Sequence, residues 1–415
     1  MTTPIIIVPG IMGTRLVDSR GRRLWDPNAD MSRQNIIRLL ANPAAAGVEV
    51  GFRTRFLRLG TTAIPSTRAR ASLTQLFRQR GIVNGGNLVW EGGYDKLVKG
   101  LSDPAFNTSC GGGTKLYAAG YDWRQSNSTS ANRLKSVVER AMRETGSSDV
   151  ILVAHSMGGH VARWFCKHAT INGTRGHRFV RHLFLLGSPI HGASKAYRAL
   201  RQSFVTADTI ADIALPQHVD TYDDSVVDLA GRAVSSLVKV IPSVYELLPT
   251  RAFCNANPNW LRFNTSLAGI ADASNPSRLY SNRHTGLTTN GVTNTLVTAF
   301  LAGRDVFDRY LGTYLPAQTT VVYSDSEPTE TVMRIESNGS LARAGGRRLN
   351  LGDGTVPTYS ASAQGNGNQN IPRLAIRGVD HVGVANHPFA VRRIQQLVAA
   401  QCVRRQTADG WRAAL

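Results

Sequence analysis

Ser156 stands in a sequence context that is typical of a catalytic nucleophile. Residues 150–163 read V-I-L-V-A-H-S-M-G-G-H-V-A-R, an aliphatic run followed by the serine, paired glycines and a helical pattern. A strand, a tight turn and a helix in this order form a nucleophile elbow, whose serine attacks a carbonyl carbon. The turn needs small residues two positions before and two after the serine, and Ala154 and Gly158 stand there. The usual pattern begins with glycine, so A-x-S-x-G differs from it by one methyl group.

A nucleophilic serine needs a base and an acid that orients the base. In the α/β-hydrolase order both follow the serine, the acid first and the histidine last. Asp353 lies in L-N-L-G-D-G-T-V-P, and His381 follows a short strand-like run at residues 374–376. Both would lie on loops after strands, where open parallel sheets carry their chemistry. We therefore predict Ser156, His381 and Asp353 as nucleophile, base and acid.

Less specific interpretations of these residues remain open. A serine N-cap would give a pattern like that around Ser156, and an Asp-Gly turn would explain Asp353. His381 could be a capping or surface imidazole. Among the rivals, His387 precedes a proline and resembles a helix entry, while Asp380 is too close to His381 in the chain to reach its ring easily. Asp325 is a further candidate acid.

The first predicted strand leads into a loop that could stabilise an oxyanion. Residues 4–16 read P-I-I-I-V-P-G-I-M-G-T-R-L, a buried strand ended abruptly by Pro9-Gly10. In a serine hydrolase the loop after such a strand supplies one backbone donor, and the residue after the nucleophile supplies the other. These donors would be the backbone N–H groups of Met12 and Met157. The alternative is an ordinary Pro-Gly turn that leaves a core strand.

Motifs along nearly the whole chain resemble the lecithin:cholesterol acyltransferase family, which includes phospholipid:diacylglycerol acyltransferases and lysosomal phospholipase A2. The matching segments occur in family order at residues 8–16, 118–124, 154–159, 186–193, 241–249, 352–357 and 380–383. The resemblance, to a bacterial member, implies an α/β-hydrolase fold, the same three catalytic residues, and oxyanion donors at Met12 and Met157. It also implies that Y-D-W-R at 121–124 is a scaffold and cleft-lining segment. It does not distinguish hydrolase from acyltransferase.

The fold class that we predict is α/β, a mostly parallel central sheet with helices on both faces. A chain of 415 residues exceeds the bare core of such an enzyme, so we expect inserted cap or lid elements. The predicted core comprises residues 1–17, 87–196 and 316–415. Residues 18–86 would form an N-terminal excursion and residues 197–315 a cap or lid insert. Within these segments we expect a short polar hairpin at 329–336. Residues 207–215 would form either a mobile amphipathic flap or a fixed part of the cap.

The chain is strongly basic, with a formal net charge of +20. No pattern of stacking aromatic residues and no nucleic-acid-binding module accompanies this charge, which argues against nucleic acid as a partner. Transient attraction to an anionic membrane surface fits better beside an acyl-ester lipid substrate. A solvated, arginine-rich surface without any partner is the simpler alternative.

The four cysteines indicate neither a disulfide framework nor a metal site. Cys110, Cys166, Cys254 and Cys402 lie far apart, without a C-x-x-C motif or a Cys/His cluster, so we expect reduced thiols and no metal or cofactor. The sequence has no apolar run of about 18 residues that would span a membrane. No signal-peptide pattern precedes the first strand, so we expect a cytoplasmic protein, unless a signal was removed or export follows another route.

Two hypotheses from different functional classes follow. The first is a phospholipase-like serine esterase or lipase that forms an acyl-enzyme, whose acyl group then passes to water or to an alcohol. The second is a catalytically silent lipid- or polyanion-binding protein on the same fold. A probe that labels only an activated serine distinguishes them.

Overall fold

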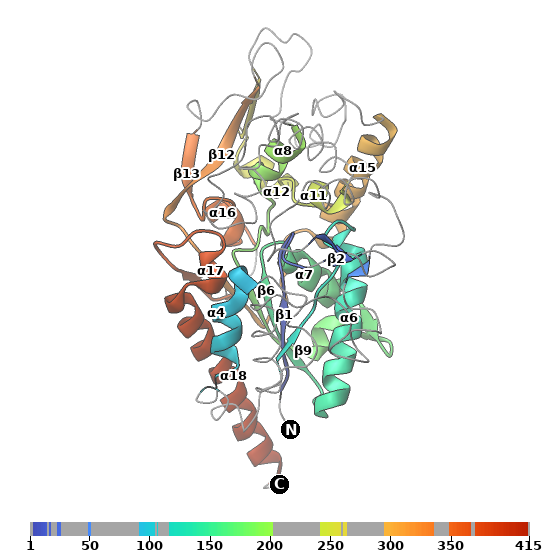
Figure 1. The fold of residues 1–415 in the computed structure, drawn as a ribbon, viewed down its shortest axis with the longest axis vertical. Helices are drawn as coiled ribbons and strands as arrows, with labels where there is room; N and C mark the ends of the chain where they lie inside the picture. Colours follow the sequence, from blue (N-terminus) through green and yellow to red (C-terminus); the bar gives the residue numbers. More distant parts are fainter. Residues whose placement is uncertain are drawn as a thin grey trace.

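A six-stranded parallel sheet forms the centre of the protein (Figure 1). The computed structural model describes residues 3–14, 16–17, 23–25, 49–50, 91–103, 106, 116–201, 241–258, 260–263, 294–335, 348–366 and 370–413. The strand order is β14-β11-β9-β6-β1-β5, and every neighbouring pair is parallel. The strands are β1 (Ile5–Val8), β5 (Leu116–Ala118), β6 (Val150–His155), β9 (Val180–Leu186), β11 (Thr319–Tyr323) and β14 (Arg373–Ala375).

The sheet is buried on both faces, which is why its central strands are continuous aliphatic runs rather than alternating ones. All four residues of β1 are buried, and so are all six of β6. Alternate side chains enter different cores, because successive residues of a strand point to opposite faces. Ile6 and Val8 belong to one hydrophobic cluster, and Ile5 and Ile7 belong to the other.

Helices cover both faces, so the predicted α/β class is correct. Helices α6 (Asn127–Thr145) and α7 (Gly158–His168) bury apolar side chains in the first cluster. Helices α4 (Glu91–Leu101), α17 (Gly383–Asn386) and α18 (Pro388–Ala413) pack on the opposite face. Figure 1 shows these two groups on opposite sides of the sheet.

Further elements lie beyond the carboxyl ends of the strands, at the top of Figure 1. They are α8 (Ser194–Arg201), α11 (Pro242–Glu246), α12 (Arg251–Ala256), α15 (Asn294–Leu311) and α16 (Thr358–Ala361), together with a small sheet of β10 (Leu261–Phe263), β12 (Glu327–Ile335) and β13 (Arg348–Gly352). The polar hairpin predicted at 329–336 is wrong. The segment 327–335 is one strand, and its antiparallel partner is β13, which follows it in the chain at residues 348–352.

The remaining short elements are β2 (Leu16–Val17), β3 (Arg23–Trp25), β4 (Glu49–Val50), β7 (Thr170–Ile171), β8 (Thr174–Arg175) and the 3-10 helix η1 (Gly176–Phe179). The possible flap at 207–215 and most of the predicted excursion at 18–86 lie outside the described residues, so the division into core and cap stays a prediction. No helix within the described ranges has the length and apolar character needed to cross a membrane.

Candidate active site

Ser156 lies in a sharp turn between β6 and α7. Its φ of 53° is in the left-handed region, which is rare for a residue with a side chain and is typical of a strained elbow. The two glycines after this turn, Gly158 and Gly159, have no room for a side chain. A Cβ on Gly158 would collide with the carbonyl groups of Val8 and Pro9, and one on Gly159 would collide with the Ser188 hydroxyl. The paired glycines therefore let α7 start directly against β1.

Three predicted residues meet at the carboxyl edge of the sheet. The Nε2 atom of His381 lies 2.8 Å from Ser156 Oγ. Its Nδ1 atom lies 2.8 Å from Asp353 Oδ2. All three residues are buried. The structure thus arranges an oxygen nucleophile, an imidazole and a carboxylate in one hydrogen-bonded series, the geometry needed for general-base activation of a serine.

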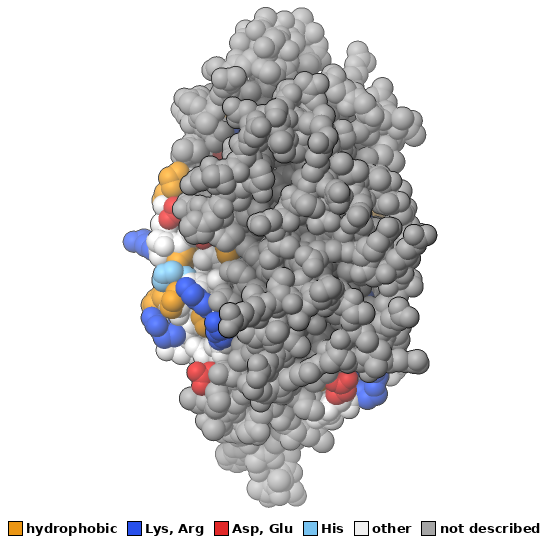
Figure 2. Space-filling view, in the orientation of Figure 1, with side chains coloured by type: hydrophobic (Ala, Val, Ile, Leu, Met, Phe, Trp, Pro, Cys, Tyr) orange, Lys and Arg blue, Asp and Glu red, His pale blue; other side chains and the backbone are white. Residues whose placement is uncertain are grey.

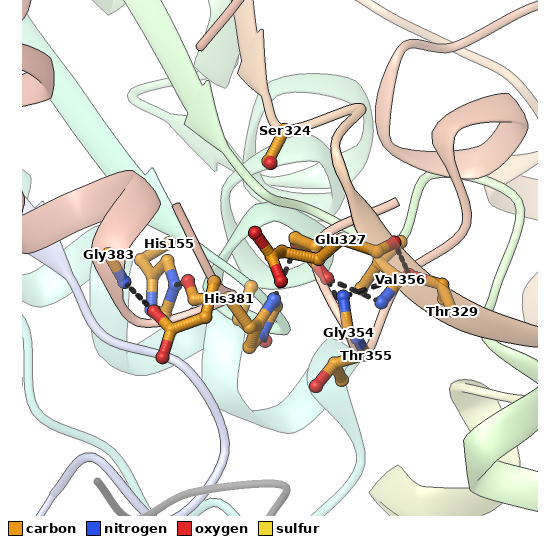
Figure 3. A network of polar contacts seen from close by, with 12 residues as sticks. His155, Ser324, Glu327, Thr329, Gly354, Thr355, Val356, His381 and Gly383 are labelled. Carbon is orange, nitrogen blue, oxygen red and sulfur yellow. Dashed lines mark hydrogen bonds and ion pairs between the residues drawn. The ribbon is translucent and has the colours of Figure 1, made fainter. Parts of the chain in front are cut away.

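The turn after β13 holds the Asp353 carboxylate in place. Its Oδ1 atom accepts hydrogen bonds from the backbone N–H groups of Thr355 at 3.0 Å and Val356 at 2.6 Å, which leaves Oδ2 facing His381. The Gly354 N–H donates to Thr329 Oγ1 at 2.8 Å and fixes the turn to β12. In Figure 3, His381 lies between His155 on one side and this turn on the other.

The hairpin-like course of β12 and β13 explains how Asp353 reaches this position. The chain leaves the sheet after β11, and β13 returns antiparallel to β12. Asp353, directly after β13, then forms an isolated bridge with Glu327 at the start of β12. The acid therefore lies near the end of β11, although about thirty positions separate them in the chain.

The loop after β1 lies directly against Ser156. A Cβ built on Gly10 would stand 2.8 Å from the Ser156 Cβ, so only glycine allows this approach. Met12 has a φ of 62°, so its backbone, like that of Ser156, lies in the left-handed region that strains a residue with a side chain. The Tyr121 hydroxyl donates to the Pro9 carbonyl at 2.7 Å and anchors the loop. Met157, the other predicted oxyanion donor, is the buried N-cap residue of α7.

The rival residues have other roles in the structure. Asp380 accepts a hydrogen bond from the Gly383 N–H at 2.6 Å. Asp325 lies 3.6 Å from the guanidinium of Arg377. His387 stands between α17 and α18, where its carbonyl accepts the Val391 N–H at 2.9 Å. None of these three side chains contacts Ser156 or Asp353 in a hydrogen bond among the described residues, which favours the predicted set.

The Y-D-W-R segment is a buried scaffold. The Arg124 guanidinium forms a two-point ion pair with the Asp122 carboxylate at 2.9 and 2.8 Å. The Ser243 hydroxyl donates to the Trp123 carbonyl at 2.5 Å, which connects this segment to another of the family-like motifs. From the same motif, the buried Glu246 accepts the Asn127 backbone N–H at 2.7 Å at the start of α6.

The sequence analysis missed two residues that lie beside the predicted set of Ser156, His381 and Asp353. His155 directly precedes Ser156, and its Nε2 atom lies 2.9 Å from the backbone carbonyl of His381. Tyr94 of α4 places its hydroxyl 2.8 Å from His155 Nδ1. Only two features of the sequence indicated these residues. Tyr94 is a polar aromatic residue on an otherwise apolar helix face, and His155 is a histidine at the end of a buried strand.

The two thiols that the structure describes fully, Cys166 and Cys254, are free and buried. Burial raises the pKa of each thiol to about 12, so neither forms a thiolate near neutral pH. Cys110 lies outside the described residues. Within the described residues, His, Cys, Asp and Glu side chains form no group that could hold a metal ion.

Comparison with known families agrees with the motifs. Residues 105–275 match the model of the lecithin:cholesterol acyltransferase family. The predicted resemblance to that family is confirmed. The matched segment includes the elbow and the Y-D-W-R motif, whereas Asp353 and His381 lie beyond it.

One solved structure shares the fold of this chain. The chain resembles the crystal structure of the Tle4–Tli4 complex with 17% sequence identity and a TM-score of 0.60, over 96% of this chain and 98% of that one. The mature lipase BlEst2 of Bacillus licheniformis aligns with 13% identity and a TM-score of 0.39, over 96% of this chain and 92% of that one. At 17% identity the likeness to the Tle4–Tli4 structure concerns the fold alone. No curated protein matched this chain in the sequence search.

Proposed function

We propose that this protein is a serine esterase or lipase that cleaves acyl esters of lipids through an acyl-enzyme intermediate. The observation that carries the proposal is the hydrogen-bonded series from Ser156 Oγ through His381 to Asp353, with 2.8 Å at both steps. A buried serine N-cap, the simplest alternative, would need neither the imidazole nor the carboxylate.

Each residue has a defined task in this mechanism. His381 Nε2 accepts the hydroxyl proton while Ser156 Oγ attacks the ester carbonyl carbon, and Asp353 holds the proton on Nδ1 and stabilises the imidazolium. The N–H groups of Met12 and Met157 donate to the oxyanion. When the tetrahedral intermediate collapses, the C–O bond to the leaving alcohol breaks and His381 returns the proton to that alcohol. Water, or a second alcohol, then attacks the acyl-enzyme by the same steps in reverse.

The family match supports a lipid as the acyl donor, and the charge of the chain supports an anionic interface. Figure 2 shows Lys, Arg and apolar side chains close together on the left flank of the molecule. On α18 of that flank, Phe389 is 53% exposed and is followed one turn later by the exposed Arg392 and Arg393. An apolar side chain beside cations suits the surface of an anionic membrane.

Lipid vesicles test this function. The protein is incubated with phosphatidylglycerol vesicles, with phosphatidylcholine vesicles and with p-nitrophenyl butyrate, and free fatty acid is measured by mass spectrometry. We expect fatty acid from at least one lipid, faster release from the anionic vesicles at low salt, and none from Ser156→Ala. A fatty alkyl ester formed in the presence of a primary alkanol would identify acyl transfer. The absence of ester cleavage on every substrate would contradict the proposal.

A further inference from the structure

A continuous series of buried hydrogen bonds joins the two sides of the proposed active site. The Gly10 N–H donates to the Tyr94 hydroxyl oxygen at 2.9 Å. That hydroxyl lies 2.8 Å from His155 Nδ1, and His155 Nε2 lies 2.9 Å from the carbonyl of His381. The series therefore begins in the loop that carries Met12 and ends on the backbone of the catalytic base.

The chemistry of the groups fixes every proton in this series. A backbone carbonyl only accepts, so His155 Nε2 must carry the hydrogen that it donates to His381. Burial lowers the pKa of His155 to about 3, so the ring is neutral near pH 7 and its Nδ1 is an acceptor. The Tyr94 hydroxyl then donates to Nδ1 while its oxygen accepts from Gly10. This single arrangement satisfies each group.

A neutral His155 also suits its neighbour. Its ring centroid lies 5.0 Å from that of His381, the ring that becomes an imidazolium during the reaction. A second cation at this distance would oppose the proton transfer from Ser156. Both ring nitrogens of His155 already have hydrogen-bond partners, so His155 does not compete with His381 for the Ser156 proton.

The helix that carries Tyr94 is itself held against the segment after His381. Helix α4 packs on α17 and α18. The Lys96 N–H donates to Asn386 Oδ1 at 2.9 Å, and the Gln395 side chain donates to the Gly100 carbonyl at 2.8 Å. On its other side, the Tyr94 ring would lie 3.4 Å from a Cβ on Gly13, so it also packs against the loop after β1.

We propose that Tyr94 and His155 are positioning residues. They fix the oxyanion loop relative to His381, so that the oxyanion donors and the base face the same carbonyl group. The inference rests on the proposed esterase function. A positioning role differs from a purely structural one because it affects the transition state. Removing these hydrogen bonds should lower kcat more than it raises KM, since ground-state binding of the substrate does not depend on how the loop and His381 are placed relative to each other.

Tyr94→Phe is the first test, because it keeps the ring and removes only the hydroxyl. With p-nitrophenyl butyrate we expect kcat to fall by about 10- to 100-fold while KM changes by less than about threefold, since small displacements of catalytic groups cost rates of this order. Tyr117→Phe is the matched control. It removes the hydroxyl of another buried tyrosine, which donates a 3.0 Å hydrogen bond to Glu144 and, among the described residues, forms no hydrogen bond with the proposed site. The kcat of this variant should stay within about twofold of wild type.

A double-mutant cycle with His155→Gln provides the second test. The glutamine amide can still donate toward the His381 carbonyl but offers no acceptor at the Nδ1 position, so it removes the same hydrogen bond as Tyr94→Phe. We expect the double variant to be no slower than the slower single variant. Additive losses would overturn the inference, and so would a Tyr94→Phe enzyme with unchanged kcat.

The tautomer of His155 gives a readout that needs no activity. Imidazole ¹⁵N NMR of the full-length protein should show hydrogen on Nε2 of His155 from pH 5 to pH 9, with the Nδ1 resonance changed in Tyr94→Phe and unchanged in Tyr117→Phe. A hydrogen on Nδ1 would overturn the inference even if Tyr94→Phe failed to fold. A wild-type enzyme that shows the predicted tautomer but cleaves no ester would instead contradict the esterase function.

Discussion

His381 Nε2 and Ser156 Oγ lie 2.8 Å apart although 225 positions separate the two residues in the chain. The parallel sheet brings them together, because Ser156 follows β6 and His381 lies a few residues after β14 at the same edge. Asp353 reaches that edge through the excursion of β12 and β13.

Removing either partner of this contact should abolish turnover. We expect Ser156→Ala and His381→Ala each to lose on the order of 10⁶ in kcat, and the double variant to be barely slower, because the residues act as a unit. Asp353→Asn should lose about 10⁴, since it leaves the imidazole in the wrong tautomer. Steady-state kinetics on a p-nitrophenyl ester measure all four variants.

The rival carboxylates provide the controls for this series. Asp380→Asn keeps an oxygen that can accept from the Gly383 N–H, and Asp325→Asn loses only an ion pair with the exposed Arg377. Both variants should stay within about threefold of wild type, as surface changes usually do. A large loss in either one, with an active Asp353→Asn, would identify a different acid.

In the loop after β1, backbone conformation and available space should decide whether a substitution is tolerated, and the chemical nature of the side chain should matter little. Met12→Leu should keep kcat within about threefold, because the residue would contribute only its backbone N–H. Met12→Val should lose much more, since a β-branched residue is strained at a φ of 62°. Gly10→Ala and Gly13→Val should each lose at least about 10²–10³ in kcat, because the added carbon atoms displace the loop. Circular dichroism should show cooperative melting in all four variants. An equal loss of kcat in Met12→Leu and Gly13→Val would mean that the loop only packs against the core.

Gly158 and Gly303 should respond to alanine with opposite signs. Gly158→Ala places a Cβ against the Val8 and Pro9 carbonyl groups, so it should destabilise the fold by at least about 1–3 kcal/mol. Gly303 is exposed in α15, and a Cβ there meets nothing within 4 Å. Gly303→Ala should therefore stabilise the protein by about 0.5–1 kcal/mol through helix propensity. Urea unfolding compares the two, and a neutral Gly158→Ala would contradict the close contact between α7 and β1.

Stability should fall below neutral pH because three histidines are buried in the neutral form. Burial, as the largest cause, lowers the pKa of His155 to about 3, that of His191 to about 4, and that of His160 well below its ordinary value. The unfolded chain binds these protons below about pH 6.5, so each histidine stabilises the fold above that pH. Each contribution declines by about 1.4 kcal/mol per pH unit as the pH falls toward the folded-state pKa. Glu246, whose pKa burial raises, has the opposite sign and offsets part of the effect.

Urea unfolding at pH 7.5, 6.5 and 5.5 measures this dependence. His191→Gln is the informative variant, because its amide can still donate to the Gln364 carbonyl, which lies 2.7 Å from His191 Nε2. Its stability should fall less steeply with acid than that of the wild type. A wild-type stability that is flat from pH 7.5 to pH 5.5 would contradict the buried neutral histidines.

The sequence was sufficient to predict the elements whose signal is local. The strand at 319–323, the elbow around Ser156 and the turn that carries Asp353 are each formed by neighbouring residues. The β12–β13 pairing was missed because 327–335 pairs with a segment that no local pattern indicates. The contacts of Tyr94 with Gly10 and of His155 with His381 were missed for the same reason, since they span 84 and 226 positions.

Covalent labelling of Ser156 tests the central claim most directly. The full-length protein is treated with a fluorophosphonate, which reacts only with an activated serine, and the adduct is located by peptide mass spectrometry. We predict one adduct per chain on Ser156, none in Ser156→Ala, and a labelling rate in His381→Ala that is lower by at least about 10³, because the base is missing. A wild-type protein that stays unlabelled, or an adduct on another residue, would contradict the account.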